Sequence, residues 1–74
     1  MPDLPHLSGR EAIRTFEKLG FVAVRQKGSH VVLRKGNRGC VIPLHKDLAI
    51  GTLRGAIKQA GITPELFAEA LDRT

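Results

Sequence analysis

The first hydrophobic pattern along the chain has helical spacing and directly follows a helix-start signal. Ser8 and Glu11 form a capping-box pattern, in which each side chain accepts a hydrogen bond from the other residue's backbone. Four apolar residues then recur at helical spacing and indicate one buried helix face: Ala12, Ile13, Phe16 and Leu19. Gly20 is placed to end this helix. A second face carries Arg10, Arg14 and Lys18, which predict a solvated face or, secondarily, a phosphate contact.

Three short runs rich in β-branched residues follow, and the turns between them predict an antiparallel meander. The expected strands are residues 21–26, 29–35 and 40–44, joined at Gly28-Ser29 and at residues 36–39. Strand side chains alternate between the two faces of a sheet. Val31 and Leu33 are therefore expected in the core. The opposite, open face then receives His30, Val32 and Arg34.

The third strand alternates in the same way. Its expected core positions are Cys40, Ile42 and Leu44, whereas Val41 and Pro43 are expected to point outward. Pro43 lacks a backbone N–H, so this is an edge strand or Pro43 stands at its end.

Two further helical patterns complete the chain after a loop at residues 45–49. Gly51-Thr52 is expected to open the first of them and Gly61 to cap it, with Arg54 and Lys58 on its outer face. Its core positions are Leu53, Ala56, Ile57 and Ala60. Thr63-Pro64 predicts the start of a last short helix. That helix has an apolar face of Leu66, Phe67, Ala70 and Leu71, and Glu65 and Glu69 favour its dipole.

The order of elements predicts an α+β fold in one domain, residues 1–74. Helices pack on one face of a three-stranded antiparallel sheet in the order α-β-β-β-α, followed by a short C-terminal helix. Residues 1–7, with Pro2 and Pro5, are expected to be a loose lead-in. The other face of the sheet is expected to stay open.

Cysteine use and hydropathy set the expected compartment. The single cysteine, Cys40, allows no intramolecular disulfide and no cysteine-based zinc site, and it is expected to be a small core residue. No long apolar run opens the chain, so neither a signal peptide nor a membrane helix is predicted. The expected location is the cytoplasm.

Charge is the most informative part of the composition. The net charge is +5 among 74 residues, and between Arg25 and Lys58 the only acid is Asp47. A solvated surface usually mixes its signs, so a basic middle segment favours a phosphate-binding face. The alternative is a basic protein without a nucleic-acid role.

The predicted hairpin turn presents one imidazole, His30, beside Lys27 and Arg25. An imidazole can accept the proton of an RNA 2′-hydroxyl, and nearby cations can stabilise the charge that develops on the phosphate. The residues alone equally allow a surface histidine in a plain RNA-binding domain. His45 is expected to be a phosphate contact or a capping group.

Other chemistries find less support in the sequence. Metal-assisted nucleases need clustered carboxylates or histidine ligands, and His6, His30 and His45 have no ligand-like spacing. No metal or other cofactor is therefore expected. The three aromatic residues are all phenylalanines with core spacing, which disfavours a base-stacking platform.

Several motifs together resemble the HicA family of small mRNA-cleaving toxins from bacterial toxin–antitoxin pairs. The most specific combination is Gly28-Ser29-His30 followed by Gly51-Thr52-Leu53-Arg54. The remaining motifs are Ser8-Gly9-Arg10-Glu11, Gly20-Phe21, Arg25-Gln26-Lys27, Val41-Ile42-Pro43-Leu44-His45 and Ile57-Lys58-Gln59-Ala60-Gly61-Ile62. The resemblance implies a fold similar to a double-stranded-RNA-binding domain.

The resemblance also implies a function. It implies an endoribonuclease, an mRNA interferase, with His30 as the catalytic residue, and a HicB-type antitoxin as partner beside the RNA. The residues expected to bind RNA are Arg25, Lys27, Ser29, Arg34, Lys35, Arg38, His45, Lys46, Arg54 and Lys58. Two alternatives stay open: a non-catalytic RNA-binding module of the same fold, and a protein-interaction domain whose basic face serves an acidic partner.

Overall fold

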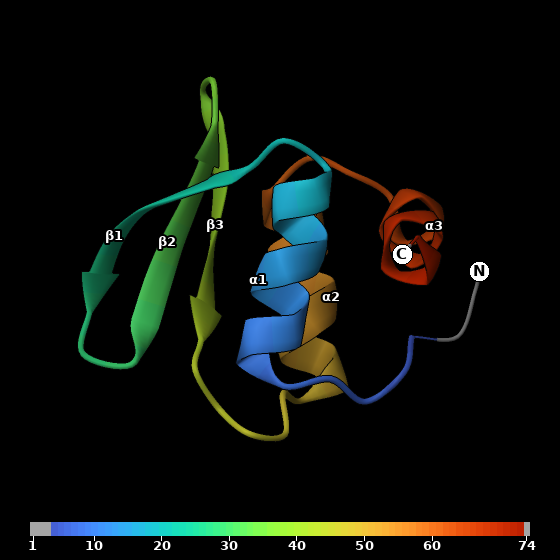
Figure 1. Ribbon diagram of the computed structural model, residues 1–74, viewed down its shortest axis with the longest axis horizontal. Helices are drawn as coiled ribbons and strands as arrows, with labels where there is room; N and C mark the ends of the chain where they lie inside the picture. The colour runs from blue at the N-terminus through green and yellow to red at the C-terminus, as the bar shows by residue number, and fades with distance from the viewer. Residues whose placement is uncertain (1–3, 74) are drawn as a thin grey trace.

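The computed structural model describes residues 4–73 and confirms the expected order of elements (Figure 1). Its helices and strands are α1 (Gly9–Lys18), β1 (Val22–Lys27), β2 (His30–Lys35), β3 (Arg38–Pro43), α2 (Ile50–Gln59) and α3 (Pro64–Asp72). The expected lead-in lies partly outside the described residues. Its last residue, Leu7, is not loose: it is 7% exposed, and its carbonyl accepts the Leu48 backbone N–H at 2.7 Å.

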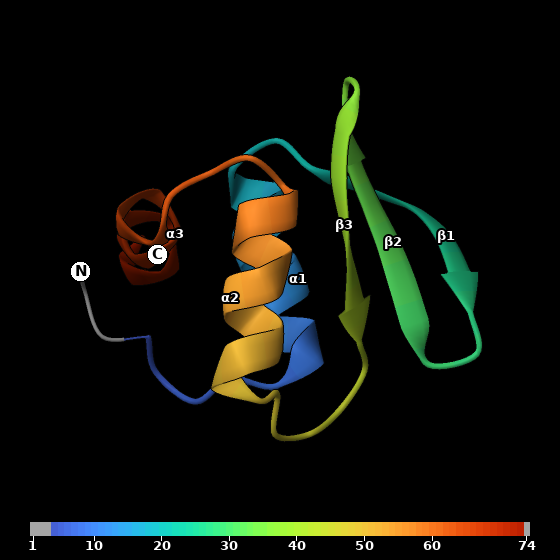
Figure 2. The ribbon, with the colours of Figure 1, turned by 180° about the vertical axis from the view of Figure 1, so that it is seen from behind.

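The three strands form one antiparallel sheet in the order β1-β2-β3. All three helices lie on one side of it, as the front and back views show (Figures 1 and 2). This confirms the α+β class and leaves one sheet face without a helical cover. Within residues 4–73, no helix is long and apolar enough to cross a membrane.

The core lies between the sheet and the helices, where the three phenylalanines meet. The ring centroids of Phe16 and Phe21 are 5.4 Å apart, and those of Phe16 and Phe67 are 5.1 Å apart. Leu33 and Ile42 close the core from the sheet, both fully buried. These contacts fix the face of the sheet that α1 covers and so decide which strand residues remain outside.

The capping box of α1 is present as expected. The Ser8 hydroxyl accepts the Glu11 backbone N–H at 3.1 Å, and the Glu11 carboxylate accepts the Ser8 N–H at 3.0 Å. The Ser8 backbone N–H, and to a smaller extent the Ser8 hydroxyl, favours the ionised carboxylate and lowers the pKa of Glu11. Gly20, with φ of +95°, follows the helix end as predicted.

Strand bounds and two burial predictions differ from the structure. β3 begins at Arg38, because the turn needs only Gly36 and Asn37; Gly36 has φ of +61°. The prediction that Pro43 points to solvent is wrong. Pro43 is buried, and the start of α1 packs so closely on it that a Cβ at Gly9 would collide with the Pro43 carbonyl. Leu44 lies beyond the strand end and is only half-buried.

The two later helices differ from expectation in smaller ways. α2 begins at Ile50 with Ala49 as its N-cap residue, one position before the expected start. α3 begins as predicted, and the Thr63 hydroxyl accepts the Leu66 N–H at 3.1 Å. Leu66 was expected on the apolar face but is 38% exposed. Phe67 and Ala70 are buried and Leu71 is half-buried, whereas Leu66 lies about 100° away from Phe67 around the helix.

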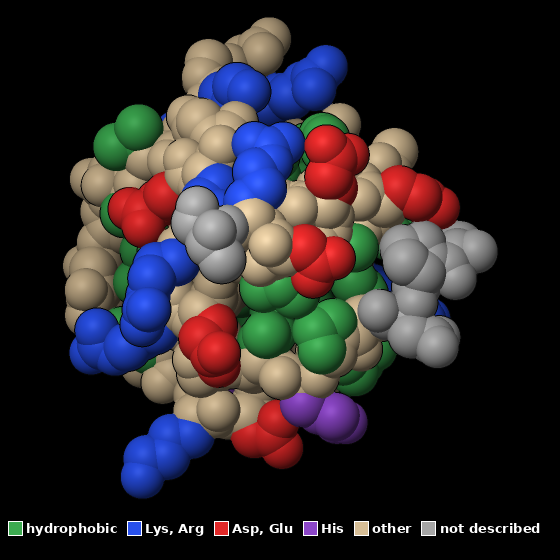
Figure 3. Space-filling view, turned by 45° about the vertical axis from the view of Figure 1, so that its right-hand side comes forward, with side chains coloured by type: hydrophobic (Ala, Val, Ile, Leu, Met, Phe, Trp, Pro, Cys, Tyr) green, Lys and Arg blue, Asp and Glu red, His purple; other side chains and the backbone are tan. Residues whose placement is uncertain are grey.

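The surface of the helical side mixes charges of both signs. Figure 3 shows acidic and basic side chains interspersed over this side. Its acidic residues include Glu65, Glu69 and Asp72 of α3, all exposed. The sheet differs, since β1 to β3 contain five Lys or Arg residues and no Asp or Glu: Arg25, Lys27, Arg34, Lys35 and Arg38.

Candidate active site on the open sheet face

Strand register places His30 on the face of the sheet that no helix covers. Val31 and Leu33 are 6% and 0% exposed on the helical side, whereas His30 and Arg34 are exposed on the other side. His30 is the first residue of β2 and pairs with Lys27 of β1 and Pro43 of β3. This confirms the expected alternation of β2.

A β-bulge at Val24 decides which cations share that face. The register with β2 shifts between Ala23 and Arg25, so that Val24 is the extra residue of β1. Ala23 pairs with Leu33 on the helical side, and Arg25 pairs with Val32 on the open side. Without the extra residue, strict alternation from Val22 would send Arg25 and Lys27 to the helical side. The bulge therefore brings both cations beside His30.

The hairpin turn holds His30 through backbone contacts. Gly28 has φ of +59°, a conformation that favours glycine, and the Gln26 side-chain amide donates to the Gly28 carbonyl at 3.0 Å. The Ser29 carbonyl accepts the Leu44 backbone N–H at 2.6 Å. The turn is thus tied to the segment that follows β3. Within residues 4–73, no side-chain hydrogen bond is made by the His30 imidazole itself.

The structure divides the expected RNA-binding residues into separate groups. Arg25, Lys27 and Arg34 share the open face with His30. Ser29, His45 and Lys46 lie at the same end of the sheet, joined through the Ser29–Leu44 hydrogen bond, and all three are exposed. Arg54 and Lys58 are exposed on α2, in the helical layer, and so are not part of the open face.

Lys35 and Arg38 point to the helical side instead. The Lys35 ammonium donates to the Leu19 carbonyl at 2.7 Å, beyond the end of α1, and lies 6.0 Å from the Phe21 ring centroid. The Arg38 guanidinium donates to the Gly61 carbonyl at 3.3 Å, just past α2. Cations at these places complement the negative ends of helix dipoles. Part of the positive charge therefore has a structural role.

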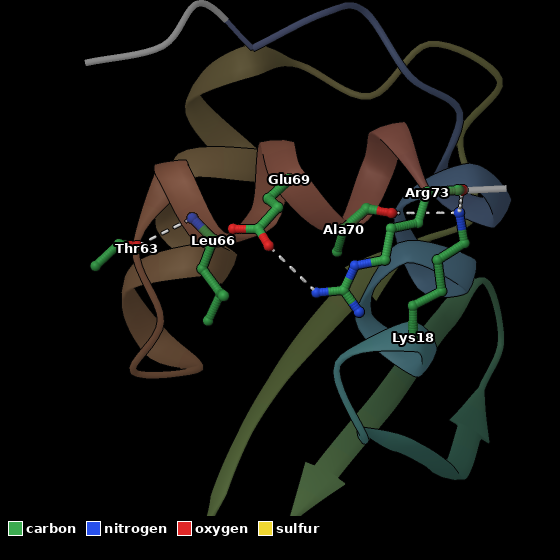
Figure 4. A network of polar contacts seen from close by, with 6 residues as sticks. All are labelled: Lys18, Thr63, Leu66, Glu69, Ala70 and Arg73. Atoms are coloured by element: carbon green, nitrogen blue, oxygen red, sulfur yellow. Dashed lines mark hydrogen bonds and ion pairs between the residues drawn. The ribbon is translucent and has the colours of Figure 1, made fainter.

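Lys18 does the same for the third helix. Its ammonium donates to the carbonyls of Ala70 and Arg73, at 3.3 and 2.6 Å, at the end of α3 (Figure 4). The basic row predicted on α1 is therefore not wholly solvated. Figure 4 also shows the Glu69–Arg73 ion pair of α3, 3.7 Å long.

The remaining titratable candidates do not join His30. Cys40 is 2% exposed, and burial raises the pKa of its thiol to about 11, which confirms it as a core residue. His6 and Asp47 form an exposed pair at 3.5 Å. Among residues 4–73, no three His, Cys, Asp or Glu side chains gather in an arrangement that could hold a metal ion.

The fold and the site define a small α+β domain with an uncovered basic sheet face that presents one imidazole. Residues 9–62 match the sequence model of the family described as HicA toxin of bacterial toxin-antitoxin. The chain belongs to this family, whose members are toxins that act with an antitoxin partner. The matched segment runs from α1 to just beyond α2, so α3 lies outside it. No curated protein and no solved structure matches the chain.

Proposed function

We propose that the protein is the ribonuclease toxin of a type II toxin–antitoxin pair and cleaves mRNA with His30 as its catalytic residue, without a metal. The observation that supports this most is the open face itself. It holds an exposed imidazole with Arg25, Lys27 and Arg34, on a sheet that contains no carboxylate. A polyanion finds attraction there and no acidic group to repel it.

The proposed reaction needs only groups present on this face. The neutral His30 imidazole accepts the proton of a 2′-hydroxyl, whose oxygen attacks the adjacent phosphorus. The bond from phosphorus to the 5′-oxygen breaks, and that oxygen takes a proton from His30 or from water. Arg25 and Lys27 stabilise the negative charge on the phosphate oxygens as it develops. The products carry a 2′,3′-cyclic phosphate and a 5′-hydroxyl.

The decisive experiment compares wild type with His30→Ala on a single-stranded RNA substrate. Cleavage is expected to be lost while the circular dichroism spectrum and melting temperature stay unchanged, because His30 is exposed and outside the core. A matched control is His6→Ala, which removes another exposed histidine that is not part of the sheet. Cleavage by the His30 variant at the wild-type rate would show that another residue is the catalyst.

Two further measurements test the chemistry. Cleavage is expected to survive EDTA, and a substrate with 2′-deoxyribose at the cleaved position is expected to resist. Loss of activity in EDTA that added Mg²⁺ or Mn²⁺ restores would contradict the metal-independent mechanism.

One observation favours a second candidate, a non-catalytic RNA-binding module. Catalytic imidazoles are commonly oriented by a hydrogen bond to their second nitrogen, and residues 4–73 supply no such side chain to His30. Under this alternative, purified wild type binds RNA with strong salt dependence but leaves it intact.

A further inference from the structure

A groove lies on the other side of the hairpin from His30, between α1 and β1. It encloses about 310 Å³, at the small end of the range for ligand sites, roughly 300–1,000 Å³. It exists because β1 extends beyond the cover of α1: every residue of β1 is exposed, including those on its helical side. Nothing in the chemistry described above uses this groove.

One wall of the groove is a single stripe of α1. Arg10, Arg14 and Glu17 stand four and three residues apart, so their side chains lie above one another on one helix face. Within residues 4–73, neither arginine takes part in an ion pair. Two unpaired guanidinium groups one turn apart can bind one phosphate through several N–H donors.

The floor of the groove is apolar. It consists of Ile13 from α1, Ala23 and Val31 from the sheet, and Leu44 from the segment after β3. Figure 1 shows that α1 begins at the same end of the molecule as the β1–β2 turn. The arginines therefore lie toward the hairpin, and Glu17 lies toward the far end of the groove.

This arrangement matches the parts of a nucleotide. A phosphate fits the arginine end, a flat base fits the apolar floor, and the Glu17 carboxylate can accept an N–H from the base edge. A fully acidic peptide fits less well, because it would bring carboxylates along an apolar floor toward Glu17. The charge gradient thus favours a ligand with one anionic end.

The groove also lies within reach of the open face. Val31 of its floor directly follows His30, and Gln26 at its rim directly precedes Lys27. β1 is the edge strand of the sheet and has no neighbouring strand on its outer side. A flexible strand that crosses the open face can pass around β1 and enter the groove.

We propose that this groove is a subsite for one nucleotide of the single-stranded RNA whose backbone crosses His30. The proposal rests on the ribonuclease function and adds a source of base preference that the aromatic-free open face lacks. Arg10 and Arg14 hold the phosphate, and the base lies over Ile13 and Val31.

The test measures equilibrium binding of a fluorescein-labelled single-stranded oligoribonucleotide of mixed sequence to the full-length chain. All variants are made in a His30→Ala background, so that cleavage does not enter the measurement. Arg14→Gln is expected to weaken binding about fivefold to tenfold and to reduce the slope of log K against log salt by about 0.7. Arg73→Gln is the matched control, because it removes the same charge at the C-cap of α3, outside the lining of the groove, and is expected to leave both values unchanged.

A second variant tests the apolar floor of the groove without changing the charge of the protein. Ala23→Leu fills the floor without changing charge, at an exposed position that tolerates it. Binding is expected to fall about fivefold, the loss expected when roughly 40 Å² of apolar contact is removed, with the salt slope unchanged.

Three outcomes would overturn the subsite. If Arg14→Gln and Ala23→Leu both leave the affinity for RNA unchanged, RNA does not bind in the groove. If Arg14→Gln and Arg73→Gln lower the affinity for RNA equally, the effect comes from the net charge of the protein and not from the groove. If the His30→Ala parent does not bind RNA, no RNA nucleotide can occupy the groove. RNA binding without cleavage by wild type would instead refute the catalytic proposal and leave the subsite standing.

Discussion

At the residue scale, the candidate site depends on Val24, the extra residue of the bulge in β1. In β2, the burial of Val31 and Leu33 fixes which side of the strand faces the core. β1 gives no such signal, since both of its faces are exposed. The bulge depends on how β1 pairs with β2, and it alone places Arg25 and Lys27 with His30.

Two lysines with the same charge are expected to behave differently toward RNA. Lys27 stands beside His30 on the open face, whereas the Lys35 ammonium already binds the Leu19 carbonyl. Lys27→Gln is therefore expected to weaken RNA binding across sequences and to reduce the salt slope by roughly one charge's worth. Lys35→Gln is expected to change RNA binding little and to destabilise the fold by about 0.5–1 kcal/mol.

Salt-dependent RNA binding and urea denaturation of both variants measure the two effects. Equal losses of RNA affinity would mean that Lys35 leaves its carbonyl to bind RNA. An unchanged salt slope for Lys27→Gln would place the RNA elsewhere.

The buried thiol of Cys40 predicts a loss of stability in alkali. Burial raises its pKa from the ordinary value of 9.0 to about 11. Between these values the unfolded chain releases the thiol proton and the folded chain retains it, so unfolding becomes easier as the pH rises. The contribution is complete below pH 9.0 and lost near pH 11.

The measurement is the free energy of unfolding at pH 8 and pH 10.5 for wild type and Cys40→Ala. The alanine variant is expected to be less stable at pH 8, because it loses buried volume, but to decline less between the two pH values. If the free energy of unfolding falls equally in wild type and Cys40→Ala, groups other than Cys40 cause the loss of stability in alkali.

At the scale of elements, each helix ends on a cation supplied by another part of the chain. Lys35 serves the end of α1, Arg38 the end of α2, and Lys18 the end of α3. Their carbonyl partners are 16, 23 and 52 residues away along the chain. Lys35 and Arg38 were expected to bind RNA, because a hydrogen-bond partner at such separations leaves no local pattern in the sequence. The starts of α1 and α3 were predictable, since the Ser8 and Thr63 hydroxyls each accept a backbone N–H three residues further on. α2 has no such side-chain cap, and its expected start was one residue late.

The start of α1 carries a prediction of its own. Ser8→Ala removes the hydroxyl that accepts the Glu11 N–H and is expected to lower the free energy of unfolding by about 1 kcal/mol. RNA binding is expected to change little, because Ser8 lies neither on the open face nor among the residues that line the groove. Urea denaturation measures the loss, with Thr52→Ala as control, since Thr52 is exposed on α2 and makes no cap. If both variants lower the free energy of unfolding equally, the loss comes from removing a hydroxyl in general and not from the helix cap.

Glu11 adds a dependence on acid. Its pKa is lowered by the Ser8 backbone N–H, so its contribution to stability is present above its ordinary pKa of 4.5 and is lost as the pH falls through the lowered value. Glu11→Gln is expected to flatten the decline of stability between pH 5.5 and pH 3.

At the scale of the whole molecule, charge is divided between two layers. The helical side mixes acids and bases (Figure 3), and the sheet carries bases alone. The open face is also not wholly polar: Val22 is 60% exposed and Val41 is 38% exposed, beside Arg25 and Arg34. Protein interfaces combine apolar and charged groups in this way. One surface therefore suits both a polyanion and a protein with acidic residues.

The last prediction concerns inhibition. Toxins of this family act with an antitoxin. We propose that the antitoxin of this protein is of the HicB type and covers the open face. Acidic side chains on it would meet Arg25, Lys27 and Arg34 and speed its capture, and an apolar group would bury Val22 and Val41. Co-expression with the product of the neighbouring gene is expected to yield a stable complex that does not cleave RNA.

Two variants separate this steric account from inhibition at a distance. Val41→Ser is expected to weaken the complex about tenfold, since it removes apolar surface that the antitoxin would bury, while free toxin still cleaves RNA. Leu66→Ser, at an equally exposed position of α3, is the control and is expected to leave the complex intact. A complex that cleaves RNA at the full rate, or one that Leu66→Ser disrupts and Val41→Ser does not, would place the antitoxin on the helical side and leave His30 uncovered.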